Sequence, residues 1–169
     1  MLTLRLTQKL AASLHVTLMK DGTPPVNPSA DWCCHRFTVA RYRYVLVTNP
    51  PTFFSVVLRT QGMGNVSDFI SGVTSGLRSY LVGAGHEFAF TQLIGPECGE
   101  VRFIPIAHRR VLGVMNEFTF MAKAYLEYLS PTETSDRLNG CPVSPLRGKF
   151  PRDVFPPTDF GSAESAPDI

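Results

Sequence analysis

Arginine and tyrosine residues alternate in one short stretch of the chain, a pattern suited to contact with an anionic partner. Arg36, Arg41 and Arg43 lie in this stretch, and Tyr42 stands between two of them. Guanidinium groups bind phosphates, and aromatic rings stack on nucleic-acid bases. The pattern therefore predicts binding of a nucleic acid or of a protein. The alternative is that these arginines are solvated and protect the edge of a sheet.

A second basic group precedes an apolar helical pattern and consists of His108, Arg109 and Arg110. Backbone N–H groups at the start of a helix favour anions, so this turn is a second predicted contact with the same partner. Asn116 follows within that helix, as a ligand contact or, alternatively, as a buried structural amide. Trp32 completes the predicted binding surface.

Histidine supports a competing hypothesis, a small nuclease or another phosphodiester-acting enzyme. His35 or His108 would serve as the general base, and Arg109 or Arg110 would hold the phosphate. Nothing in the spacing of these residues brings them together. The favoured interpretation is therefore a non-enzymatic binding or accessory protein, which contacts its partner through the Arg/Tyr hairpin and the turn at 108–110.

Cysteine and histidine residues raise the question of a metal site. Zinc takes thiolate and imidazole ligands, and the candidate ligands are Cys33, Cys34, His35, Cys98 and His108. Adjacent residues of a strand point to opposite faces, so Cys33 and Cys34 are poorly placed to bind one ion. Cysteine is also among the most frequently buried residue types. We therefore expect structural cysteines, no metal and no other cofactor.

The composition is that of a modest globular protein with a nearly balanced charge. The chain has 169 residues, of which 44% are hydrophobic, and its net charge is +2. So small a charge does not by itself indicate a nucleic-acid partner. Residues 1–130 are nevertheless basic, with twelve Lys and Arg against eight Asp and Glu. We expect a cytoplasmic protein without membrane contact, because the sequence shows neither an export signal nor a long apolar run.

Alternating apolar and polar residues predict the elements that must position these side chains. We expect strands at 2–6, 35–39, 43–49, 52–60 and 100–106, and helices after Thr7, at 67–82 and at 111–129. The segment 87–95 fits a strand or a short helix. The middle three strands predict an antiparallel meander. The fold class is α+β, with an antiparallel sheet of four to six strands and two or three helices mainly on one face.

The composition changes at Ser130. Seven of the fourteen prolines fall in the last 39 residues, which contain few aliphatic residues. We therefore expect one domain at 1–130 and a proline-rich, extended or disordered tail at 131–169. The tail also carries hydrophobic residues that would dock on a partner or fold back on the domain, namely Leu146, Phe150 and Phe155.

Three segments together resemble a family of uncharacterised bacterial domains that are sometimes carried on plasmids and other mobile elements. The matching residues are Thr7, Lys9 and Leu10, then Trp32, Arg41, Thr48 and Asn49, and finally Arg110–Gly113, Met115 and Asn116. The resemblance covers residues 1–126. Two departures are the Cys33–His35 run after the tryptophan and the Arg109–Arg110 pair. The resemblance implies a mobile-element, phage or defence setting, and it implies no particular activity.

Overall fold

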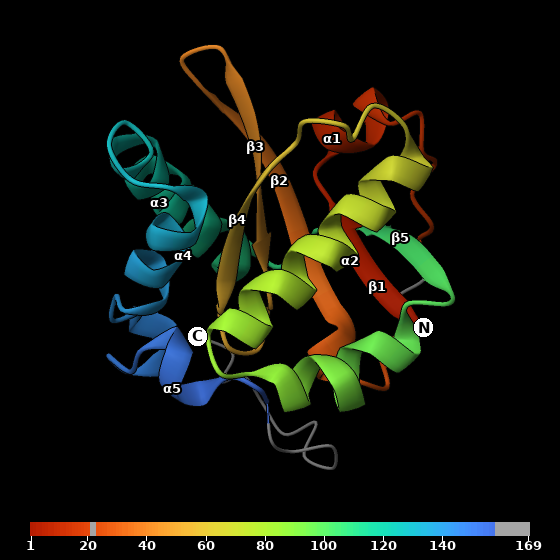
Figure 1. Cartoon of the computed structure of the whole chain (residues 1–169). Helices are drawn as coiled ribbons and strands as arrows, with labels where there is room; N and C mark the ends of the chain where they lie inside the picture. Colours follow the sequence, from red (N-terminus) through yellow and green to blue (C-terminus); the bar gives the residue numbers. More distant parts are fainter. Residues whose placement is uncertain (21–22, 158–169) are drawn as a thin grey trace.

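Five strands form one mixed sheet in the order β4-β3-β2-β1-β5 in the computed structural model (Figure 1). The structure describes residues 1–20 and 23–157. The strands are β1 (Leu2–Leu6), β2 (Asp31–Val39), β3 (Tyr42–Thr48), β4 (Ser55–Arg59) and β5 (Val101–Pro105). The β2–β3 and β3–β4 pairs are antiparallel, which confirms the predicted meander. In contrast, β1 pairs in parallel with both β2 and β5.

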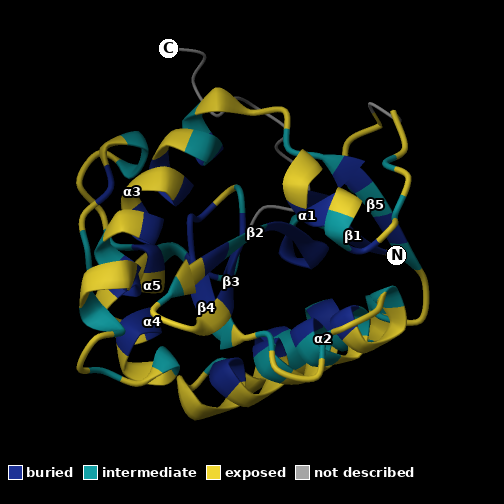
Figure 2. Ribbon diagram, turned by 90° about the horizontal axis from the view of Figure 1, so that it is seen from above, coloured by how far each residue is buried: buried dark blue, intermediate teal, exposed yellow. Residues whose placement is uncertain are grey.

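Helices cover both faces of the sheet. They are α1 (Gln8–Ser13), α2 (Val66–Gly83), α3 (Arg109–Tyr125), α4 (Pro131–Asn139) and α5 (Pro151–Val154), with a π-helical segment at Ala89–Ile94 and single 3₁₀ turns at Pro28–Ala30, Gly95–Glu97 and Ser144–Leu146. One core lies between the sheet and α1, α2 and the π-helical segment. A second core lies between the sheet and α3 and α4. Figure 2 shows the buried residues facing the sheet from both sides.

The α+β class and the number of strands are confirmed, and two details of the architecture differ from expectation. The sheet is mixed, because long connections containing helices lead from β1 to β2 and from β4 to β5, and such connections permit parallel pairing. The helices lie on two faces because the central strands are apolar on both. Val45, Leu46 and Val47 of β3 are all fully buried.

The predicted helix at 67–82 is confirmed as α2. Its N-cap is Asn65, whose side chain accepts a hydrogen bond from the backbone of Asp68 at 2.9 Å. A Cβ atom at Gly72 would lie 2.4 Å from a Met63 side-chain carbon, and one at Gly76 would lie 2.6 Å from Leu58. These two glycines therefore allow α2 to pack closely on β4 and on the loop that follows it.

The segment that we expected to be an extended or disordered tail is instead folded as far as the structure describes it. Ser130 and Glu133 form a capping box at the start of α4, where Pro131 occupies the first turn. The side chains of α4 then hydrogen-bond to the backbone of the edge strand β4, so residues beyond 130 continue the same packed unit. The stretch 158–169 of the predicted tail lies outside the described residues.

The three predicted docking residues of the tail have different environments. Phe155 is buried, and its ring stacks on Phe54 with the centroids 4.4 Å apart and lies 5.8 Å from the ring of Trp32. Leu146 and Phe150 are half-buried. Of the two predicted roles, Phe155 thus takes the one in which the segment folds back on its own domain.

Candidate functional site

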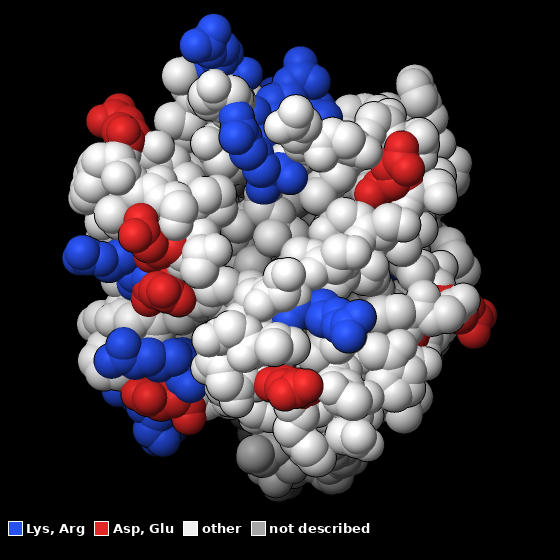
Figure 3. All heavy atoms as spheres, viewed as in Figure 1, with Lys and Arg blue, Asp and Glu red and all other residues white. Residues whose placement is uncertain are grey.

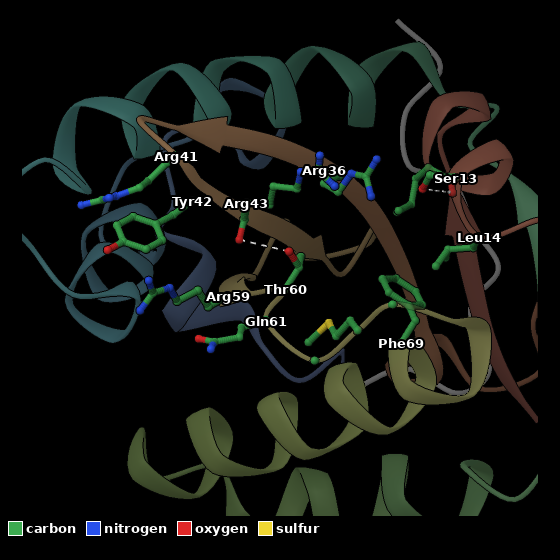
Figure 4. A pocket seen from close by; sticks show the side chains of 14 residues that line it. Ser13, Leu14, Arg36, Arg41, Tyr42, Arg43, Arg59, Thr60, Gln61 and Phe69 are labelled. Carbon is green, nitrogen blue, oxygen red and sulfur yellow. Dashed lines mark hydrogen bonds between the residues drawn. The ribbon is translucent and has the colours of Figure 1, made fainter.

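A pocket of about 730 Å³ lies beside the β2–β3 hairpin and brings together arginine residues from three strands. Its lining includes Arg36 of β2, Arg41 of the turn, Arg43 of β3 and Arg59 of β4. Residues of α1, the start of α2 and the loop between β4 and α2 complete the wall. We call this pocket, defined by the four arginines, the arginine groove (Figure 4).

The charge of the arginine groove is uncompensated. No acidic residue lines it, and within the described part of the chain none of the four arginines forms an ion pair. Figure 3 shows basic side chains gathered on the hairpin above a hollow in the surface. Like charges so close to one another repel, and a bound anion would relieve that repulsion.

The hairpin extends beyond its neighbouring strand and thereby forms one wall of the groove. Cys34 is the last residue of β2 that pairs with β1, so β2 continues past the end of β1 from His35 onward. Arg36 lies two residues after Cys34 on β2, and Arg43 lies two residues before Val45 on β3. Cys34 and Val45 belong to the core between the sheet and α1 and α2. Side chains alternate across a strand, so Arg36 and Arg43 point to the same side of the sheet.

The loop after β4 is fixed against the hairpin at the groove. Both the backbone N–H and the hydroxyl of Thr60 donate hydrogen bonds to the carbonyl of Arg43, each at 3.1 Å. The backbone N–H of Met63 then donates to the carbonyl of Thr60, and Gly62 adopts a positive φ of 82° in this tight turn. The wall opposite the hairpin is therefore held by backbone hydrogen bonds.

Tyr42 lies among the arginines and is held by them. The guanidinium carbon of Arg59 is 4.0 Å from the centroid of the Tyr42 ring, and that of Arg41 is 5.7 Å away. Both distances are within the range of cation–π contacts. Tyr42 remains 42% exposed. The ring is thus positioned while part of its surface is accessible to a partner.

The structure gathers four predicted binding residues, Arg36, Arg41, Tyr42 and Arg43, around this one groove. The sequence interpretation missed Arg59. Arg59 ends β4 and pairs in register with Tyr44, a position that depends on the pairing of the strands. Residues diagonal to a cross-strand pair are within reach of long side chains, and Tyr42 stands in that position.

The turn at 108–110 lies apart from the groove, at the start of α3. His108 is the N-cap of α3. Phe118 of α3 packs in the second core, whereas Leu10 and Phe69, which line the groove, belong to the first core. The helix that follows this turn and the groove therefore lie on opposite faces of the sheet.

Two further predicted binding residues lie outside the groove. Trp32 is completely buried, and its indole N–H donates to the carbonyl of Ser29 at 3.0 Å. It is a core residue, because its ring fills the space beside Phe155. Asn116 is exposed on α3, so the alternative of a buried structural amide is wrong. Arg109 is likewise exposed, whereas Arg110 is half-buried.

The histidine and cysteine residues have separate environments. Burial, and then the charges of Lys123 and Lys9, lower the pKa of His35. No hydrogen bond links His35 to His108 within the described residues. Cys33 and Cys34 are buried in the two different cores, as the alternation of strand residues predicted, and burial raises the pKa of both thiols. No group of three or more potential metal ligands occurs within residues 1–20 and 23–157.

A buried ion pair that the sequence did not indicate joins β1 to β2. Two nitrogens of the Arg5 guanidinium donate to the two carboxylate oxygens of Asp31 at 2.8 and 3.0 Å. Burial raises the pKa of Asp31, against the opposing effect of Arg5. Arg5 is thus satisfied internally, in contrast to the arginines of the groove.

Comparison with known proteins identifies a family. The model of the family described as Domain of unknown function (DUF6933) matches residues 3–158, so the chain belongs to this family. No curated protein and no solved structure matches the chain. The match continues past residue 126, where the resemblance seen in the sequence ended, and includes α4 and α5. No helix among the described residues is long and apolar enough to cross a membrane.

Proposed function

We propose that this member of the DUF6933 family is a non-enzymatic binding or accessory protein whose arginine groove binds the phosphates of a nucleic acid. The observation that carries the proposal is the convergence of four arginines, three from strands and one from the β2–β3 turn, on one pocket without an acidic neighbour in its lining. Guanidinium groups recognise phosphate oxygens with paired hydrogen bonds. Neutralising several phosphates at once supplies most of the affinity in such complexes.

The shape of the site favours this function over simple protection of a sheet edge. Edge-protecting charges need only point into solvent, whereas Arg36, Arg43 and Arg59 line one concave surface. The aromatic ring of Tyr42 among them also fits a nucleic acid better than an acidic protein, because bases offer flat surfaces for stacking. A phosphate-bearing partner uses both features of the groove.

The setting that we propose for this activity comes from the sequence. The three segments that resemble bacterial domains carried on plasmids support a cytoplasmic role in mobile-element, phage or defence biology. The turn at 108–110 is a separate surface in this proposal, since α3 packs on the face of the sheet opposite to the groove.

The proposal is tested by fluorescence anisotropy with a labelled oligothymidylate of about 12 nucleotides. The double variant Arg41→Gln/Arg43→Gln removes two charges from the groove and is expected to weaken binding by tenfold or more, equivalent to about 1.4 kcal/mol. The matched control, Arg78→Gln/Arg137→Gln, removes two exposed charges outside the groove and is expected to change affinity less than threefold. The oligonucleotide is expected to be recovered intact after incubation.

Three results would contradict the proposal. The wild-type protein would fail to bind the oligonucleotide, or the groove variant and the control would lose affinity equally. Equal losses would mean that binding follows net charge and not the groove. Cleavage of the oligonucleotide that disappears in His35→Ala or His108→Ala would instead support the phosphodiester-acting enzyme.

A further inference from the structure

The arginine groove combines its charges with an accessible aromatic ring, which a purely phosphate-binding surface does not need. Tyr42 lines the groove and is 42% exposed. The apolar residues Leu10, Leu14 and Phe69 form the buried base of the groove, and Met63 is half-buried beside them. Figure 4 shows Arg41, Tyr42 and Arg59 at one end of the pocket and Leu14 and Phe69 at the other. The groove thus presents an aromatic ring together with cationic groups.

The volume of the groove limits the size of the ligand that can enter it. Its volume of about 730 Å³ is within the range of pockets that take small organic ligands, which is about 300–1,000 Å³. A nucleic-acid duplex keeps its bases stacked inside and offers only its backbone to a concave site of this size. A single strand, in contrast, has unpaired bases that turn into a pocket while the backbone follows the charges outside.

Tyr42 stands where such a base would stack. Arg59 covers the ring at 4.0 Å, whereas Arg41 lies farther away at 5.7 Å. A base that stacks on the ring displaces only the more distant guanidinium, which then binds the adjoining phosphate. Arg59 meanwhile keeps the ring in place.

We propose that the groove selects single-stranded over double-stranded nucleic acid, with one base stacked on Tyr42 and the flanking phosphates bound by the arginines. This inference rests on the proposed nucleic-acid function and adds to it the strandedness of the partner. Tyr42 is then a specificity-determining residue, and the arginines supply affinity for either form. Sequence preference is expected to be small, because every base has a face that stacks.

The experiment compares the oligothymidylate of about 12 nucleotides with a duplex of equal length by fluorescence anisotropy. Wild-type protein is expected to bind the single strand at least tenfold more tightly. Tyr42→Leu is expected to reduce single-strand affinity roughly 5-fold to 100-fold, the equivalent of one lost stacking contact, and to leave duplex affinity unchanged. Tyr42→Phe retains the ring and is expected to stay within threefold of wild type.

Controls separate a stacking role from a general loss of structure. Tyr128→Leu changes a tyrosine that is 70% exposed outside the groove and is expected to bind both forms like wild type. Thermal unfolding of each variant confirms that it is folded. Thymidine monophosphate and inorganic polyphosphate serve as competitors, and both are expected to displace the strand less effectively than unlabelled oligothymidylate does at equal phosphate concentration.

Distinct results would overturn this inference and the function on which it rests. Equal affinity for both forms, with no effect of Tyr42→Leu, would leave a phosphate-binding groove and remove the selection of single strands. Polyphosphate that displaces the strand as effectively as unlabelled oligothymidylate does would also remove the selection of single strands. Equally effective displacement by thymidine monophosphate would show that the groove binds a free nucleotide and not a strand. Absence of binding to either nucleic acid would overturn the proposed function itself.

Discussion

The edge strand β4 and the projecting end of the β2–β3 hairpin differ in how their polar side chains are partnered. Along β4, the side chains of α4 hydrogen-bond to the strand backbone. The amide of Asn139 accepts from the N–H of Ser55 and donates to its carbonyl, both at 2.8 Å, and the hydroxyl of Ser135 accepts from Val57 at 2.8 Å. We call these contacts the α4 seam. Along the hairpin, the arginines of the groove form no ion pair with any described residue.

This difference separates polar residues that build the fold from those available to a partner. At the α4 seam every bond replaces one that the edge strand would otherwise make with water or with another chain, so the seam closes the edge. In the arginine groove the charged side chains form no ion pair with a described residue, and their positive charges add to one another. The account therefore predicts that the seam governs stability and that the groove governs binding.

The largest effect is expected at the α4 seam. Asn139→Ala leaves the buried N–H and carbonyl of Ser55 without their partners and removes a contact to the Tyr80 hydroxyl at 3.2 Å. The free energy of unfolding is expected to fall by about 2–3 kcal/mol. Urea denaturation measures this loss, and Thr132→Ala, at an exposed position of the same helix, is the matched control. A loss below about 0.5 kcal/mol would show that the seam contributes little.

A smaller effect is expected from pH at the core that Phe155 completes. The His86 ring lies 5.6 Å from Phe54 and 5.2 Å from Phe155, and burial lowers its pKa below the ordinary 6.5. The unfolded chain therefore takes up a proton at higher pH than the folded chain. This contribution to stability is complete above about pH 6.5 and is lost as the pH falls. His35, whose pKa is also lowered, acts in the same direction.

The pH effect is measured by repeating the denaturation between about pH 7.5 and about pH 5. His86→Gln is expected to lose less stability on acidification than the wild type does. His15→Gln, at an exposed position, is expected to follow the wild-type curve. A His86→Gln protein that follows the wild-type curve as well would assign the acid sensitivity to other groups.

The smallest effect on stability is expected in the arginine groove, and this contrast with the seam is the sharper test. Arg36→Gln/Arg43→Gln removes two like charges from a repelling group and breaks no ion pair with a described residue. The free energy of unfolding is expected to change by less than about 0.5 kcal/mol, or to rise. Urea denaturation at low ionic strength shows this. A loss above about 1 kcal/mol would place these arginines among the residues that build the fold.

The sequence indicated elements that bury apolar faces and missed those held by polar bonds. The hairpin, α2 and α3 were predicted because Phe37, Leu77 and Phe118 recur with strand or helix periodicity. In contrast, α4 buries a single large apolar side chain, Leu138, and packs through Ser135 and Asn139. The Ser130–Glu133 capping box signalled a helix start there, but the prolines outweighed it in the interpretation.

The candidate site was predictable only where its residues are neighbours in the sequence. Arg41, Tyr42 and Arg43 are consecutive, so their pattern was visible. Arg59 joins them through the register of β3 with β4, which follows from the pairing of strands and not from the residues themselves. For the same reason the sequence does not show that the hairpin and the turn at 108–110, the two predicted contacts with one partner, are far apart, since the face of the sheet on which α3 lies is fixed only by its packing.

The most direct test of the arginine groove is the salt dependence of oligothymidylate binding between about 50 and about 200 mM salt. Each neutralised phosphate of a single strand contributes about −0.7 to the slope of log affinity against log salt concentration, so four arginines predict a slope of about −2 to −3. The variant in which all four are changed to glutamine is predicted to have a slope near zero. An unchanged slope in that variant would contradict the account.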